Sequence, residues 1–80
     1  MYYVYVLQSQ KDKSLYTGMT KNVQRRLLEH NSGKTKSITH KIPYRLVYVS
    51  SCFMTGTEAR KFEKYLKSGA GREFINSLKF

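Results

Sequence analysis

The sequence has few acidic residues, a single cysteine and no long hydrophobic run. Five Asp and Glu face fifteen Lys and Arg, which leaves a net charge of +10 at pH 7. An excess of this size predicts a polyanionic partner, nucleic acid before an anionic membrane surface. The lone Cys52 excludes an intramolecular disulfide and a Cys-based zinc finger, and it fits a reducing cytoplasm. Because no apolar run approaches ~20 residues and signal-peptide features are lacking, we expect a cytoplasmic protein without a membrane span.

The length and composition predict one small folded domain over residues 1–80. Apolar residues make up 40% of the chain and aromatic residues 14%, which is too rich for intrinsic disorder. A chain of this length buries roughly 60% of its unfolded surface, so we expect a thin core.

Hydrophobic patterning predicts an α/β (α+β) domain in which a small, mostly antiparallel three-stranded sheet is flanked by helices in ββαβα order. The expected elements are strands at residues 2–8, 15–20 and 45–51, helices at 22–33 and 57–68, and a short terminal helix at 73–78. The first strand is apolar on both alternating faces, so we place it in the centre of the sheet. Gly69 and Gly71 are expected to stop the second helix, and residues 34–43 form the longest loop.

In the first helix, two neighbouring arginines are predicted to have different surroundings. At 100° per residue, Val23, Leu27 and His30 share the inward face. Arg26 lies at the edge of that face, whereas Arg25 points nearly opposite, toward solvent. A guanidinium held at such an edge suits bidentate phosphate recognition. The alternative is an arginine that lies along the apolar surface with its head in water.

The second helix carries one acidic residue between an apolar arc and a basic stripe. The arc consists of Ala59, Phe62, Tyr65 and Leu66. The stripe consists of Arg60, Lys64 and Lys67. Glu63 falls between them, either as an i, i+4 partner of Lys67 or as a carboxylate at a cleft edge that holds a divalent ion beside phosphate.

Tyrosine, glycine and histidine complete the set of candidate site residues. Tyr5 and Tyr16 stand on adjacent strands, where a buried tyrosine ordinarily packs its ring and bonds its hydroxyl. Gly18 lies inside a strand pattern and indicates a bulge or the close approach of another group. His30 and His40 could reach one site, although a histidine on an apolar helix face is more often a core residue. Together with one distant cysteine they lack zinc-ligand spacing.

In this order and spacing, these residues resemble the GIY-YIG nuclease superfamily. The first tripeptide of that name matches as Tyr3-Val4-Tyr5 and the second as Tyr16-Thr17-Gly18. The family arginine follows the second glycine by eight positions and falls on Arg26, and the family glutamate falls on Glu63. The length of the chain and its runs at residues 29–33 and 67–74 are most similar to small stand-alone bacterial members of the UPF0213 group. The resemblance covers essentially the whole chain and implies the GIY-YIG fold.

Three positions qualify the match. Tyr3 replaces the glycine of the first tripeptide, and Met19 stands where many members carry a lysine. If that lysine tunes the base, its absence lowers the expected activity. Asn76 is a candidate for an asparagine that recurs late in some members.

The resemblance implies a metal-dependent endonuclease that hydrolyses phosphodiester bonds in nucleic acid, DNA before RNA, in repair or recombination. Glu63 would hold a single Mg²⁺ or Mn²⁺ ion, and Arg26 would bind the non-bridging phosphate oxygens. Tyr16 or Tyr5 would act as general base, which requires a nearby cation because a phenol is a poor base at pH 7. His30 would accept a hydrogen bond from a tyrosine or position the attacking water.

Surface lysines and arginines are expected to follow the nucleic-acid backbone without reading sequence, so binding should weaken with salt. The candidates in and after the long loop are Lys34, Lys36, Lys41 and Arg45. The candidates on the second helix are Arg60, Lys64 and Lys67.

Two other functions fit the same sequence. One is a non-catalytic nucleic-acid binding module, in which the motif survives as structure. The other is a subunit of a larger nuclease complex, in which a protein partner supplies substrate specificity. Binding to a membrane surface ranks last, because the basic residues are spread over helices and loops and no helix opposes a broad apolar face to them.

Overall fold

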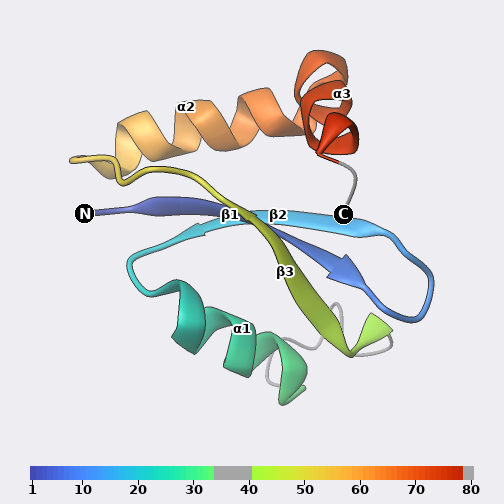
Figure 1. The fold of residues 1–80 in the computed structure, drawn as a ribbon. Coiled ribbons are helices and arrows are strands. Elements are labelled where there is room, and N and C mark those ends of the chain that lie inside the picture. Colours follow the sequence, from blue (N-terminus) through green and yellow to red (C-terminus); the bar gives the residue numbers. More distant parts are fainter. Residues whose placement is uncertain (34–40, 79–80) are drawn as a thin grey trace.

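A three-stranded antiparallel sheet lies between one helix and a pair of helices (Figure 1). The structure is a computed structural model and describes residues 1–33 and 41–78. The elements in chain order are β1 (Tyr3–Ser9), β2 (Leu15–Thr20), α1 (Val23–Asn31), β3 (Tyr44–Val49), α2 (Gly56–Lys67) and α3 (Gly69–Ser77). Helix α1 covers one face of the sheet, and α2 with α3 covers the other. The predicted fold class is confirmed, with a longer third helix than expected.

Strand β1 is central, as its two apolar faces predicted. The sheet order is β2-β1-β3, and β1 pairs antiparallel with both neighbours. Val4 and Val6 point to one face, where they pack against the buried side chains of α2 and α3. Tyr5 and Leu7 point to the other face and pack with Tyr44 and the apolar side of α1. Alternation along one strand therefore supplies both layers of the core.

Helix α1 lies within the predicted range of residues 22–33 and is capped at both ends. The Asn22 side chain accepts a hydrogen bond from the backbone N–H of Arg25 at 3.0 Å, and Gly33 follows the last turn with φ of 83°. The Asn31 side chain then joins the helix to β3. Its Oδ1 accepts from the Tyr44 N–H at 2.6 Å, and its Nδ2 donates to the Tyr44 carbonyl at 3.0 Å. This pair of bonds holds the start of β3 against the end of α1.

The region after α2 differs from the prediction that Gly69 and Gly71 end one helix before another begins at residue 73. Ser68 is the only residue between α2 and α3 and caps both helices. Its backbone N–H donates to the Tyr65 carbonyl at 3.0 Å, and its hydroxyl oxygen accepts from the Gly71 N–H at 3.3 Å. The two glycines therefore lie in the first turn of α3 rather than in a break.

Gly71 is required by packing at this corner. A Cβ atom there would overlap the carbonyl of Tyr65 and the Cα of Leu66. Only a residue without a side chain lets α3 begin this close to the last turn of α2.

Tyr65 does not belong to the buried arc of α2. Its side chain is 45% exposed, and its ring stacks on Phe62 with a centroid separation of 5.9 Å. The rest of the arc faces the sheet as predicted, with Ala59 and Leu66 fully buried. A ring lying flat on its helical neighbour stays at the surface even though it falls at the edge of the apolar face.

Candidate active site

The site is built around Tyr5, which reaches from the central strand across Gly18 on β2. The two residues are directly opposed in the β1–β2 ladder. A Cβ atom at Gly18 would lie 2.7 Å from the Tyr5 hydroxyl and 2.9 Å from Cζ. The predicted close approach at this glycine is therefore confirmed, and the approaching group is the phenol of Tyr5. The missing side chain lets that hydroxyl lie over an edge strand of the sheet.

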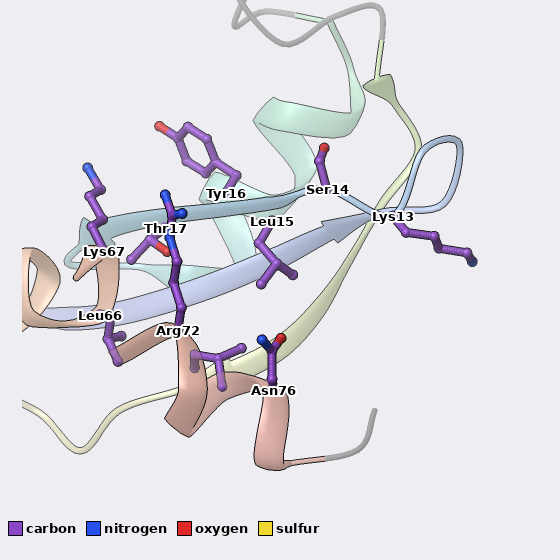
Figure 2. A pocket seen from close by; sticks show the side chains of 10 residues that line it. Lys13, Ser14, Leu15, Tyr16, Thr17, Leu66, Lys67, Arg72 and Asn76 are labelled. Atoms are coloured by element: carbon purple, nitrogen blue, oxygen red, sulfur yellow. The ribbon is translucent and has the colours of Figure 1, made fainter. Parts of the chain in front are cut away.

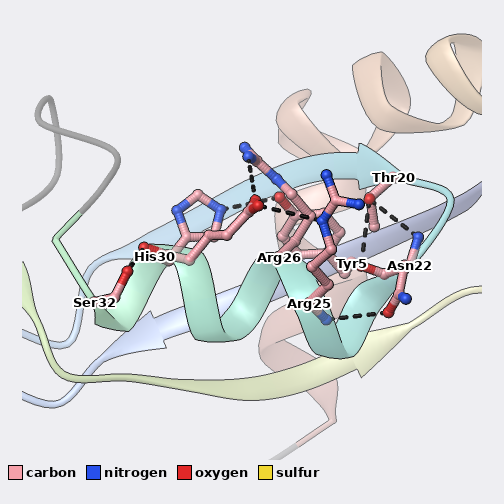
Figure 3. Close-up of polar contacts among 8 residues, drawn as sticks. Tyr5, Thr20, Asn22, Arg25, Arg26, His30 and Ser32 are labelled. Atoms are coloured by element: carbon pink, nitrogen blue, oxygen red, sulfur yellow. Dashed lines mark hydrogen bonds and ion pairs between the residues drawn. The ribbon is translucent and has the colours of Figure 1, made fainter.

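The Tyr5 hydroxyl is hydrogen-bonded to Nε2 of His30 at 3.1 Å (Figure 3). His30 is fully buried on the inward face of α1, so the core position predicted for it is confirmed. Burial lowers the pKa of His30, and the positive charge of Arg26 lowers it further. The ring is therefore neutral at pH 7, with one nitrogen protonated.

The other ring nitrogen of His30, Nδ1, is buried and has no hydrogen-bond partner among residues 1–33 and 41–78.

Arg26 and Arg25 have the different surroundings that the helical wheel predicted. The Arg26 side chain is 34% exposed and that of Arg25 is 74% exposed. Both donate to Glu29, Arg26 at 3.0 Å and Arg25 at 3.3 Å. Hydrogen bonding from Arg26, then from Arg25, lowers the pKa of Glu29. Glu29 was not identified from the sequence, although its i+3 and i+4 spacing from two arginines is a signal for such a pair.

Tyr5 keeps its proton in the resting protein. Burial raises the pKa of Tyr5, hydrogen bonding with Arg26 opposes that rise, and the negative charge of Glu63 adds to it. Its hydroxyl therefore acts as a fixed link between Arg26 and His30. The contribution from Glu63 means that a carboxylate on α2 acts electrostatically on a phenol of β1.

Tyr16 completes the cluster from β2. Its ring meets His30 edge-on at a centroid distance of 4.9 Å and lies 6.4 Å from that of Tyr5. Unlike Tyr5 it is only half-buried, and its hydroxyl points away from the strand (Figure 2). Of the two tyrosines predicted as candidate bases, Tyr16 is the one that solvent can reach.

Glu63 forms the i, i+4 pair that its spacing predicted. Its carboxylate lies 3.5 Å from Lys67 Nζ and the side chain is 16% exposed. The described residues contain no group of three His, Cys, Asp or Glu side chains that could enclose a metal ion. A single carboxylate nevertheless suits Mg²⁺, which keeps several water ligands and takes the rest from substrate phosphate. The residues present therefore fit a divalent ion at Glu63 and do not fit zinc.

The other predicted basic residues are distributed around the molecule. Lys34 and Lys36, like His40, lie outside the described residues. Lys41 pairs with Asp12 at 3.8 Å, and Arg45 on β3 donates to the Gln8 side chain at 3.5 Å. Arg60 and Lys64 are exposed on α2. Among the predicted nucleic-acid-binding residues that are described, the structure brings Lys67 beside Glu63 and does not gather the others at this cluster.

A groove of about 510 Å³ opens beside the cluster, between β2 and the α2–α3 corner (Figure 2). Tyr16 and Lys67 line it together with Arg72 and Asn76 of α3. The late asparagine thus lies in this groove. Arg72 was not identified from the sequence, because nothing in its local pattern separates it from an ordinary surface arginine.

No helix in residues 1–33 and 41–78 is long and apolar enough to cross a membrane.

Comparison with known proteins identifies the family. Residues 1–76 match the GIY-YIG catalytic domain. A UPF0213 protein of Bacillus licheniformis is 45% identical over 67 residues, covering 82% of this chain and 67% of that protein. One from Streptococcus agalactiae is 42% identical over 78 residues, covering 96% and 86%. The solution structure of a UPF0213 protein from Bacillus halodurans is 40% identical, with a TM-score of 0.56 over 99% of this chain and 86% of that one. The chain belongs to the GIY-YIG family of nucleases.

Proposed function

We propose that this protein is a divalent-metal-dependent endonuclease that hydrolyses phosphodiester bonds in nucleic acid, with DNA as the expected substrate. The observation that carries the proposal is the meeting of Tyr5, Tyr16, Arg26 and His30 from β1, β2 and α1, with Glu63 of α2 adding to the rise in the pKa of Tyr5. Four chain segments supply one polar cluster, as a site for chemistry requires.

Arg26 binds the scissile phosphate. Glu29 and the Tyr5 hydroxyl fix its guanidinium, and the remaining donors are free to contact two non-bridging oxygens. Negative charge increases on those oxygens in the transition state, so a cation already held in position stabilises that state more than the ground state.

The two tyrosines have different roles. Tyr16, the more exposed of the two, would take the proton of the attacking water as a phenolate, a form that a nearby cation favours. Tyr5 is a positioning residue, because its buried and protonated hydroxyl ties Arg26 to His30. His30 packs against both rings and holds the Tyr5 hydroxyl in place through its hydrogen bond at Nε2.

Glu63 holds the divalent ion, which when bound would neutralise charge on the phosphate and on the leaving oxygen. Lys67 pairs with the carboxylate at 3.5 Å. The exposed, unpaired Cys52 is compatible with work in a reducing cytoplasm. The alternative is a subunit of a larger nuclease complex in which a protein partner supplies substrate specificity, since so small a domain offers little surface beyond its site.

The test is cleavage of plasmid, single-stranded and branched DNA and of structured RNA with Mg²⁺, Mn²⁺ or EDTA. We expect metal-dependent cutting that falls at least a hundredfold in Glu63→Gln and in Arg26→Ala. Arg25→Ala is the matched control, because it removes the neighbouring exposed arginine from the same carboxylate. Cutting by Glu63→Gln at the wild-type rate would refute the catalytic assignment. Binding without cutting of any substrate would support the non-catalytic module.

A further inference from the structure

The groove beside the cluster has the character of a nucleotide site. Its volume of about 510 Å³ lies within the range of roughly 300–1,000 Å³ in which small ligands bind. None of the ten residues that line it is acidic. Two of them, Tyr16 and Lys67, also belong to the candidate active site, because Tyr16 touches His30 and Lys67 pairs with Glu63.

One end of the groove is cationic. Figure 2 shows Arg72 extending from α3 toward Thr17 on β2, with Lys67 beside it. The structure shows no ion pair for Arg72 within residues 1–33 and 41–78. Lys13 lines the groove as well, but its side chain points away from it. The Lys67–Arg72 end therefore favours an anion, and it is the end next to Glu63.

The other end is apolar. Leu15 points from β2 toward α3 (Figure 2) and is 38% exposed, and the buried Ile75 of α3 also lines the groove. The Asn76 amide stands at the side and offers both a donor and an acceptor. A phosphate alone would make no favourable contact with these aliphatic side chains. A nucleotide matches both ends, with its phosphate on the cations and its base on the apolar surface.

We propose that this groove binds one unpaired nucleotide next to the scissile phosphate, so that the substrate is nucleic acid with an unpaired base at the cleavage point. A base inside a duplex is stacked and paired and cannot enter a concave site without being extruded. A bulged, overhanging or single-stranded base is already free to enter. This inference rests on the proposed function, because it identifies the substrate of the same site.

Equilibrium binding in EDTA tests the inference without cleavage. The probes are a fluorescent 20-base-pair DNA duplex and the same duplex with one extra, unpaired thymidine in the middle. We expect the bulged duplex to bind at least tenfold more tightly. Arg72→Ala and Leu15→Ser, both substitutions of surface side chains, should each reduce this ratio at least threefold.

Arg60→Ala is the matched control, because Arg60 is an exposed arginine that does not line the groove. It should weaken binding to both duplexes equally and leave the ratio unchanged. Equal binding of the two duplexes, or a ratio that neither Arg72→Ala nor Leu15→Ser alters, would overturn the inference.

Cleavage of the same two duplexes with Mg²⁺ separates the two proposals. Preferential binding of the bulged duplex without cutting means that the nuclease proposal fails and the groove remains a nucleotide site. Cutting of both duplexes with equal binding means the reverse.

Discussion

Substituting Gly18 by alanine should damage both the fold and the site. The new Cβ atom would lie 2.7 Å from the Tyr5 hydroxyl, so reaching an ordinary contact of 3.4 Å requires a shift of about 0.7 Å. Tyr5 cannot give way freely, because it is 1% exposed and bonded to His30 at 3.1 Å. Overpacking of this kind costs about 1–3 kcal/mol, and disturbing a buried hydrogen bond costs about 1–3 kcal/mol more. We expect a loss of about 3 kcal/mol, which lowers the melting temperature of a domain this size by about 12–24 °C.

Urea unfolding of Gly18→Ala measures this loss, and Gly69→Ala is the matched control. A Cβ atom at Gly69 meets nothing within 4 Å, so alanine in that helical position should stabilise slightly. In a Tyr5→Phe background the atom nearest to the new methyl group is gone, and the Gly18→Ala penalty should shrink by about 1 kcal/mol. If Gly18→Ala is as well tolerated as Gly69→Ala, the argument that this glycine makes room for Tyr5 is refuted.

Three further substitutions test other contacts. Burial depresses the pKa of His30 below its usual 6.5, so below that pH the unfolded chain binds a proton that the folded chain excludes, and the free energy of unfolding should fall as the pH drops below about 6.5. The urea midpoint should therefore fall less between pH 7.5 and 5.5 in His30→Gln than in the wild type. An equal fall in both proteins would contradict this. Gly71→Ala forces a methyl group onto rigid backbone at Tyr65 and should cost about 3 kcal/mol or prevent folding, as circular dichroism would show; a wild-type melting curve counts against it. Asn31→Ala removes both bonds to the Tyr44 backbone and should cost about 2 kcal/mol in urea unfolding, so an unchanged midpoint would mean that water replaces them.

Local patterns predicted the parts of this protein that depend on local physics. Alternating apolar residues on both faces of one segment identified the central strand, and the 3.6-residue period separated Arg26 from Arg25. The predicted helix at residues 22–33 agrees with α1 and its caps at Asn22 and Ser32, because capping is decided within a few residues. The unusual glycine at residue 18 indicated a close approach, although the sequence could not name the approaching group as Tyr5.

Features made by contacts between distant segments could not be predicted. Two glycines after α2 favour a stop when they are considered locally, whereas the real constraint at Gly71 is the backbone of the preceding helix. The groove depends on how far α3 stands from β2, which no local pattern specifies. Arg72 therefore looked like any surface arginine.

The one-residue corner at Ser68 limits how this fold can vary. Glu63 and Lys67 stand on one side of the corner, and Arg72 and Asn76 stand on the other. An insertion or deletion there would rotate α3 by about 100° per residue relative to α2 and would carry the groove away from the carboxylate. Protein engineers who wish to change the substrate should therefore alter side chains along α3 and keep residues 65–71 intact. Changes of loop length belong elsewhere in the chain.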